Sequence, residues 1–222
     1  PSIGTSTAEV PGPGYLYQID ATIADVYLVS GQDRAEIVGR PTMYFVVDVF
    51  SRAIVGMYIG LENASWVSAM EALGNAMANK VDYCAEHGID ITSDLWPMQG
   101  LPEHIIGDKG EMLGRHVEVL SKAFHVEIQN TPAYRADWKG IVERYFRTVQ
   151  TKMKPFVEGY VTKNPIGKKR HGNDYRQDGI LTLKEFTKMM IKIVLHYNND
   201  HVIRTYDIDS DIPKKLPANP LA

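Results

Sequence analysis

Short apolar runs rich in β-branched residues alternate along this chain with polar, glycine- and proline-containing stretches, and each run predicts a strand. The five predicted strands cover 15–30 (interrupted after residue 22), 43–50, 53–60, 103–108 and 125–129. Only Ser51 and Arg52 separate the second strand from the third, which predicts a β-hairpin whose turn is capped by Asp48.

In four other segments apolar residues recur every three to four positions, and this spacing predicts helices. The predicted helices cover 65–80, 112–124, 138–154 and 183–198. Ser65 is the expected N-cap of the first helix, and Pro155 ends the third. The last helix is expected to bury Phe186, Met189, Met190, Ile193 and Val194. The stretch 83–99 is expected to be irregular, because Gly88 and Pro97 break any long element.

This order of elements, three strands followed by alternating helices and strands, predicts an α/β fold with helices on the faces of a mixed sheet. A chain of 222 residues, 44% hydrophobic and 23% charged, is typical of one soluble domain with a peripheral extension. We expect no membrane partner, since there is no apolar run of 18 residues and no signal-peptide pattern. The lone Cys84 rules out an intramolecular disulfide, argues against a thiolate zinc site and fits a reducing cytoplasm.

Three acidic residues have surroundings that point to chemistry. Asp20 and Asp108 each follow an apolar run predicted to be a strand, and Glu143 lies in a predicted helix, with separations of 88 and 35 residues. Carboxylates at strand ends and on a helix can converge around hard divalent cations. Two Mg²⁺ ions about 3.5–4 Å apart can clamp the attacking and leaving oxygens of an in-line phosphoryl displacement. The alternatives are turn-capping aspartates and a glutamate on a solvated helix face, ion-paired to Arg147.

Other acidic and imidazole side chains compete for this role. Asp25, Asp48 and Glu111 lie near the same elements, and Asp48 is expected to cap the hairpin rather than to join the site. Asp137 is expected to cap the helix that carries Glu143. We do not expect His104 or His116 to be metal ligands, because a hard cation prefers oxygen.

Taken together, the elements and the three carboxylates resemble the retroviral-integrase superfamily of ribonuclease-H-like transposases. The matching features are Asp20 in QIDAT, the hairpin VVDVFSRAIVG (46–56), Asp108 in IIGDKG, and Glu143 after Gly140. QIDAT, the long insert before Asp108 and TPAYRADWKGIVER are most similar to TnsB-type transposases, with phage Mu-type transposases next. The resemblance covers about residues 14–155, and more loosely the following helix and YNND (197–200).

This resemblance implies a ribonuclease-H-like fold, a five-stranded mixed sheet with three antiparallel strands and flanking helices. It implies Mg²⁺-dependent polynucleotidyl transfer with two ions, for which Mn²⁺ can substitute. Water would cut the 3′ end of a transposon strand, and the freed 3′-OH would attack target DNA without a covalent protein intermediate. Asp20, Asp108 and Glu143 match the metal ligands position by position.

The resemblance also implies partners and a domain plan. The partners would be double-stranded DNA of the transposon ends and target, further transposase copies assembled on it, an AAA+ target-selection regulator and a separate 5′-strand endonuclease. The location would be the bacterial cytoplasm, at the nucleoid. The expected segments are an N-terminal linker (1–14), the catalytic core (15–155), a basic loop (156–181), a C-terminal helical extension (182–207) and a proline-rich linker (208–222). The absence of an initial methionine and the proline-rich end are what an excised fragment would show.

Basic residues are concentrated in the second half of the chain. Residues 1–110 carry a net charge of −9 and residues 111–222 a net charge of +6, which fits a metal site beside a phosphate-binding surface. Uneven surface charge without function remains the alternative. The expected DNA contacts are Lys109, Arg135, Lys139, Arg144, Arg147, Lys168, Lys169 and Arg170. Tyr134 and Trp138 could stack on an unpaired base, or Trp138 could simply pack.

Two other functions stay open at this point. One is another nuclease of the same fold, a ribonuclease or junction resolvase, which the 35-residue spacing and the hairpin disfavour. The other is a non-catalytic DNA-binding scaffold, which the three intact carboxylates disfavour.

Overall fold

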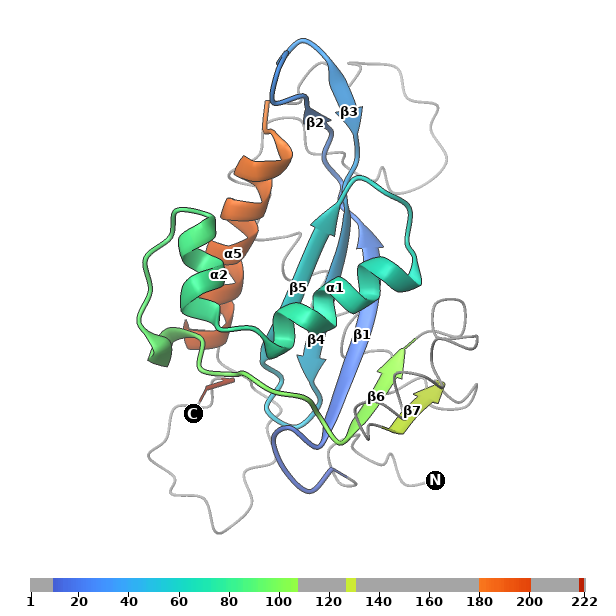
Figure 1. Ribbon diagram of the computed structural model, residues 1–222, viewed down its shortest axis with the longest axis vertical. Coiled ribbons are helices and arrows are strands. Elements are labelled where there is room, and N and C mark those ends of the chain that lie inside the picture. The colour runs from blue at the N-terminus through green and yellow to red at the C-terminus, as the bar shows by residue number, and fades with distance from the viewer. Residues whose placement is uncertain (1–9, 108–126, 131–179, 201–219, 222) are drawn as a thin grey trace, which may run out of the picture.

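The computed structural model describes residues 10–107, 127–130, 180–200 and 220–221. Within this part of the chain the main sheet has five strands in the order β5-β4-β1-β6-β7 (Figure 1). Their bounds are β1 Leu16–Ile23, β4 Thr42–Asp48, β5 Ile54–Gly60, β6 His104–Gly107 and β7 Glu127–Asn130. β1, β4 and β5 pair antiparallel, whereas β6 pairs parallel with both β1 and β7. The expected mixed sheet is confirmed.

The predicted hairpin is the β4–β5 pair, and Asp48 caps its turn as expected. The Asp48 carboxylate accepts hydrogen bonds from the Ser51 backbone N–H at 2.8 Å and from the Ser51 hydroxyl at 2.5 Å. Arg52 has a φ of 66°, a left-handed conformation that is uncommon for a residue with a side chain. The Asp48 contacts therefore hold a tight turn that the backbone alone would not favour.

Helix α1 (Trp66–Met77) begins as predicted, with the Ser65 side chain accepting from the Ser68 backbone N–H. Small residues form its contact with the sheet: a Cβ added at Gly56 of β5 would lie 2.5 Å from the Ala72 carbonyl oxygen. The helix can approach β5 this closely only because position 56 has no side chain. Its buried face consequently carries alanines, while Trp66 is only half-buried.

The expected continuation of this helix to residue 80 was wrong, as was the irregular structure expected at 83–86, whereas residues 87–99 contain no long element, as expected. The backbone is extended at Ala78, and a second helix, α2 (Lys80–Glu86), follows. Asn79 starts it by accepting a hydrogen bond from the Val81 N–H at 2.8 Å. Gly88, with a φ of +64°, lies just beyond its C-terminus. A single 3₁₀ turn, η1 (Ser93–Leu95), is the other short element of this connection.

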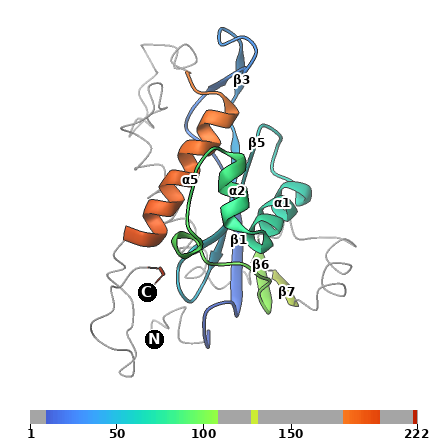
Figure 2. The same ribbon diagram turned by 60° about the vertical axis from the view of Figure 1, so that its left-hand side comes forward.

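Helix α5 (Leu183–Asp200) covers the face of the sheet opposite to α1 (Figures 1 and 2). It packs on Met43, Phe45 and Val47 of β4, whereas the alternating residues Tyr44 and Val46 pack on the α1 side. Four of the five apolar residues predicted to be buried in this helix are buried, and Met189 is half-buried. The predicted helices 112–124 and 138–154 lie outside the described residues.

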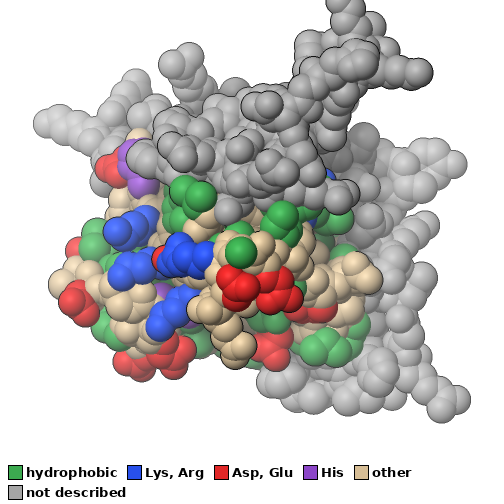
Figure 3. Space-filling view, turned by 90° about the horizontal axis from the view of Figure 1, so that it is seen from above, with side chains coloured by type: hydrophobic (Ala, Val, Ile, Leu, Met, Phe, Trp, Pro, Cys, Tyr) green, Lys and Arg blue, Asp and Glu red, His purple; other side chains and the backbone are tan. Residues whose placement is uncertain are grey.

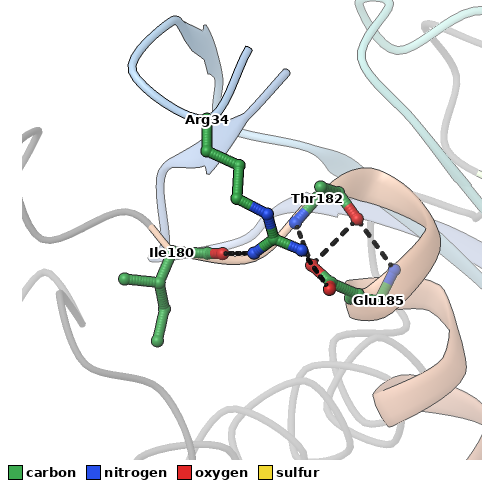
Figure 4. A network of polar contacts seen from close by, with 4 residues as sticks. All are labelled: Arg34, Ile180, Thr182 and Glu185. Carbon is green, nitrogen blue, oxygen red and sulfur yellow. Dashed lines mark hydrogen bonds and ion pairs between the residues drawn. The ribbon is translucent and has the colours of Figure 1, made fainter. Parts of the chain in front are cut away.

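A small second sheet was not anticipated by the sequence analysis. It pairs β2 (Leu28–Val29) with β3 (Ile37–Gly39), and the Val29 N–H donates to the Leu181 carbonyl at 3.0 Å. This contact ties the small sheet to the segment leading into α5. The adjoining side chains reinforce it, because Arg34 donates to the Ile180 carbonyl at 3.0 Å and to the Glu185 carboxylate at 2.5 Å (Figure 4).

A search of the described residues for a helix of the length and apolar character needed to cross a bilayer found none.

Candidate active site

Asp20 lies inside β1, the central strand of the described sheet, and is half-buried. It pairs with Phe45 of β4, and its carboxylate accepts a hydrogen bond from the Ala21 N–H at 2.9 Å. The expectation that Asp20 ends its strand was wrong, because antiparallel pairing with β4 extends β1 through Ile23.

On its other side, β1 pairs with β6, which is described up to Gly107. The parallel register joins Leu16 to His104, Tyr17 to Ile105 and Gln18 to Ile106. Asp20 therefore lies two positions beyond the last described pair of this parallel ladder.

The side chain of Asp20 shares a face of the sheet with Gln18. Successive strand residues point to opposite faces, and Tyr17 and Ile19 belong to the core beneath α1. Gln18 and Asp20 lie opposite Val47 and Phe45, which belong to the core on the α5 side. Beyond Leu16, β1 thus presents apolar residues to α1 and the polar residues Gln18 and Asp20 to the other face.

Gln18 is the residue that the sequence analysis missed. Its side chain is 4% exposed, and among the described residues no partner hydrogen-bonds to its buried Oε1. A buried acceptor without a partner costs about 1–3 kcal/mol, so its presence calls for a reason other than stability. A signal was visible in the sequence: Gln18 is a polar residue inside the apolar run YLYQID, at the same strand phase as Asp20.

Asp48 is excluded from this site by its direction. It pairs with Tyr17, so it lies on the α1 face, opposite to Asp20. Its pKa is raised by burial, although the Ser51 and Gly14 hydrogen bonds oppose that shift. The same neighbourhood raises the pKa of Tyr17 to about 12, chiefly through burial and then through the Asp48 charge. Asp48 is a buried structural carboxylate, as predicted.

The remaining competitors within the described residues also have structural partners. Asp25 is buried and receives a hydrogen bond from the Arg40 guanidinium at 2.5 Å. The Nδ1 atom of His104 lies 3.1 Å from the Glu127 carboxylate, within ion-pair distance but without a hydrogen bond, and its ring contacts Tyr15. Glu111, His116 and Asp137 lie outside the described residues.

Asp20 is the one member of the predicted acidic triad that falls in the described part of the chain. Asp108 and Glu143 lie outside it, as do all the predicted DNA contacts, namely Lys109, Arg135, Lys139, Arg144, Arg147, Lys168, Lys169 and Arg170. A search restricted to the described residues found no group of three or more His, Cys, Asp or Glu side chains able to hold a metal ion. Of the three predicted site residues, the structure therefore describes Asp20 alone.

The described surface carries mixed charge. Seen from above, Lys and Arg side chains gather on one part of the surface with Asp and Glu side chains beside them (Figure 3). Helix α5 carries three lysines at four-residue spacing, of which Lys184 and Lys192 are exposed and Lys188 donates to the Gly88 carbonyl at 2.8 Å. Because acidic side chains lie among them, this surface alone does not indicate a nucleic-acid interface.

Comparison with known proteins adds an independent line of evidence. The family model for the TnsB C-terminal domain matches residues 18–159. The chain is 47% identical over all of its 222 residues to the transposon Tn7 transposition protein TnsB of Escherichia coli, and covers 31% of that protein. It is 25% identical over 153 residues to the transposase for transposon Tn552 of Staphylococcus aureus, a match that covers 68% of this chain and 29% of that protein. The chain thus spans about a third of the length of these curated relatives.

A solved structure agrees on the fold. A chain of the simian T-cell lymphotropic virus intasome, determined in complex with the PP2A regulatory subunit B56 gamma, superposes with a TM-score of 0.50 at 13% identity. The match covers 90% of this chain and 57% of that one. At this identity the likeness concerns the fold alone, and it fits a ribonuclease-H-like α/β architecture.

Proposed function

We propose, from the premise that this chain belongs to the TnsB C-terminal domain family of the integrase superfamily, that it is the catalytic core of a TnsB-type transposase. Its reaction would be Mg²⁺-dependent cleavage of transposon 3′ ends followed by their transfer into target DNA. Asp20, Asp108 and Glu143 would carry the chemistry.

The register between β1 and β6 is the observation that most directly supports this assignment. Gln18 pairs with Ile106. Asp20 lies two positions after Gln18 in the sequence, and Asp108 lies two positions after Ile106. If the parallel pairing continued in this register, residue 108 would come beside Asp20. In a parallel pair, residues in register share a face of the sheet, so two carboxylates would meet on the face that carries Gln18.

The donors proposed for the site are all oxygens, which is the chemistry that Mg²⁺ and Mn²⁺ prefer. Asp20, Asp108 and Glu143 would hold the cations, and bound cations would supply charge neutralisation and polarisation at the scissile phosphate. Three carboxylates brought together repel one another, so the empty site would bind cations readily. DNA phosphate oxygens would complete the coordination shell, which makes cation and DNA binding mutually reinforcing.

Two in-line displacements at phosphorus would make up the reaction. In the first, a water oxygen bonds to the phosphorus at the transposon end, and the bond to the 3′ oxygen breaks to leave a 3′-OH. In the second, that 3′-OH bonds to a phosphorus of the target strand and displaces the neighbouring 3′ oxygen. Each displacement breaks one P–O bond and forms another, so no oxidant or energy carrier is consumed.

The partners follow from the same proposal. Duplex DNA of the transposon ends and target would be the substrate, held by the basic residues named above, including Lys168, Lys169 and Arg170 of the basic loop. Further transposase copies would assemble on the DNA. An AAA+ target-selection regulator and a separate 5′-strand endonuclease would complete the system.

A direct test compares the chain with its Asp20→Asn and Glu143→Gln variants in Mn²⁺, on a branched strand-transfer substrate and on an RNA–DNA hybrid. Nicking or resealing of the branched DNA that both variants lose, with the hybrid untouched, is the expected result. Cutting of the hybrid would favour a ribonuclease instead. If the chain bound the branched DNA but left both substrates intact, a non-catalytic scaffold would be the better description. Far-ultraviolet circular dichroism on the variants checks that they remain folded.

A further inference from the structure

Gln18 combines deep burial with an unused hydrogen-bond acceptor. Its side chain is 4% exposed, yet no described residue donates to its Oε1. Asn198 of α5, which is also buried, shows the opposite behaviour, because both its amide oxygen and its amide nitrogen bond to the backbone of Ile54. Buried amides that serve the fold have partners, so the missing partner of Gln18 among the described residues calls for a further group at this position.

The position of Gln18 indicates where that group would lie. Gln18 and Asp20 are two residues apart on one strand, which separates their Cα atoms by roughly 6.6 Å on the same face. A water bound to Mg²⁺ lies about 2.1 Å from the ion, and it donates a hydrogen bond over about 2.8 Å. The two lengths sum to about 4.9 Å, which is the separation that one such water would bridge between a cation at the Asp20 carboxylate and the amide oxygen of Gln18.

We propose that Gln18 is a positioning residue, whose Oε1 accepts a hydrogen bond from a water in the hydration shell of a divalent cation held at Asp20. This inference rests on the proposed function, since it requires a cation at Asp20. It adds to that function a residue that does not touch the cation itself but orients a water bound to it. A methionine or leucine would fill the same buried space without leaving an acceptor unpaired, so the amide is explained by a bound cation and not by packing.

Equilibrium Mn²⁺ binding, followed by the electron paramagnetic resonance signal of the free ion, tests the proposal without any need for catalysis. The native chain is compared with Gln18→Met, which keeps the side-chain length and removes the oxygen. We expect Gln18→Met to bind the Asp20-dependent Mn²⁺ about tenfold more weakly, as is typical when a residue that hydrogen-bonds to a metal-bound group is removed. Its metal-free melting temperature should not be lower than that of the native chain, because no hydrogen bond is lost.

Two further variants make the result specific. Thr22→Val alters the residue on the other side of Asp20 on the same strand face, and its Mn²⁺ affinity should stay within twofold of the native value. Gln18→Glu restores an acceptor oxygen, and we expect it to bind Mn²⁺ no more weakly than the native chain. Asp20→Asn defines the signal that belongs to the site.

The possible outcomes separate this inference from the proposed function. If the native chain and Asp20→Asn bind the same amount of Mn²⁺, there is no Asp20-dependent cation site, and both the site and the inference are wrong. If that uptake is present but Gln18→Met retains it unchanged, the proposed function stands and the inference alone is overturned. A metal-free melting temperature lowered by several degrees in Gln18→Met would show that the amide serves the fold, and would also overturn the inference.

Discussion

Two buried amides in different regions of the molecule illustrate two uses of the same chemical group. Asn198 is fully buried at the β5 edge of the main sheet, where its oxygen accepts from the Ile54 N–H at 2.9 Å and its nitrogen donates to the Ile54 carbonyl at 3.0 Å. Gln18 is nearly as buried on the Asp20 face of β1, and no described residue donates to its oxygen. Asn198 makes the two hydrogen bonds that a neighbouring strand would make to Ile54, whereas the Gln18 oxygen has no partner among the described residues.

This difference teaches how to separate structural polar residues from functional ones when both are buried. An edge strand presents unpaired backbone groups that must be covered, and the Trp96 indole N–H adds a second donor to the Ile54 carbonyl at 2.8 Å. Removing the covering group should cost stability. Removing an unpaired amide should not cost stability, and should instead affect whatever the amide binds.

The largest expected effect comes from Asn198→Leu. The substitution removes the acceptor of the Ile54 N–H and leaves that donor buried, so we expect the free energy of unfolding to fall by about 3 kcal/mol. Gln18→Met is the matched control, with no expected loss. Urea denaturation followed by tryptophan fluorescence measures both. Equal losses in the two variants would remove the distinction between the two amides.

Lys80 is a third buried polar group, and we expect it to make the free energy of unfolding depend on pH. Its ammonium donates to the carbonyls of Ala76, Ala78 and Met98 at 3.0–3.1 Å, and burial lowers its pKa to about 8 from 10.5. Between these two values the unfolded chain holds a proton that the folded chain has released, so stability rises with pH in that window.

We therefore expect the native chain to gain stability relative to Lys80→Met by roughly 1 kcal/mol per pH unit between pH 8 and 10. Subtracting the free energy of unfolding of Lys80→Met from that of the native chain removes the contribution of tyrosines such as Tyr17 and Tyr58, because both proteins contain them. Chemical denaturation at several pH values measures it. A flat difference would mean that Lys80 keeps its ordinary pKa in the folded state.

Local patterns in the sequence predicted the elements that depend on local interactions. The β4–β5 hairpin, the Ser65 cap of α1 and helix α5 were predicted because each shows a periodicity or a capping residue within its own segment. The start of α2 carried a comparable signal in Asn79, but the predicted first helix ran past it to residue 80. The capping box Thr182–Glu185 was likewise readable and missed.

Elements that depend on distant partners could not be predicted in this way. Strands β2 and β3 are two and three residues long, and β2 is completed by a contact with Leu181 more than 150 residues away in the chain. The candidate site has the same character. The family resemblance identified Asp20, but its place inside a strand depends on β4 pairing, and the importance of Gln18 depends on a missing hydrogen bond that only coordinates reveal.

A smaller effect is expected at Asn75, which covers β5 from the α1 side. Its oxygen accepts from the Met57 N–H at 3.0 Å, and its side chain is 8% exposed. Asn75→Leu should lower the free energy of unfolding by about 1–2 kcal/mol, less than Asn198→Leu, because Asn75 makes one such bond where Asn198 makes two. The same urea titration measures it. A loss equal to that of Asn198→Leu would mean that the number of bonds does not set the cost.

The smallest effect is expected for the most exposed of these polar groups, Arg34, which contacts the start of α5 (Figure 4). The side chains of Arg34 and Glu185 are 62% and 42% exposed, so solvent screens their ion pair and Arg34→Ala should cost less than about 1 kcal/mol. Thr182→Ala removes the cap of α5 and should cost at least as much, about 1 kcal/mol. Urea denaturation of both single variants and of the double variant measures the coupling between them. If Arg34→Ala cost as much as Asn198→Leu, burial would not be what distinguishes the polar groups of this molecule.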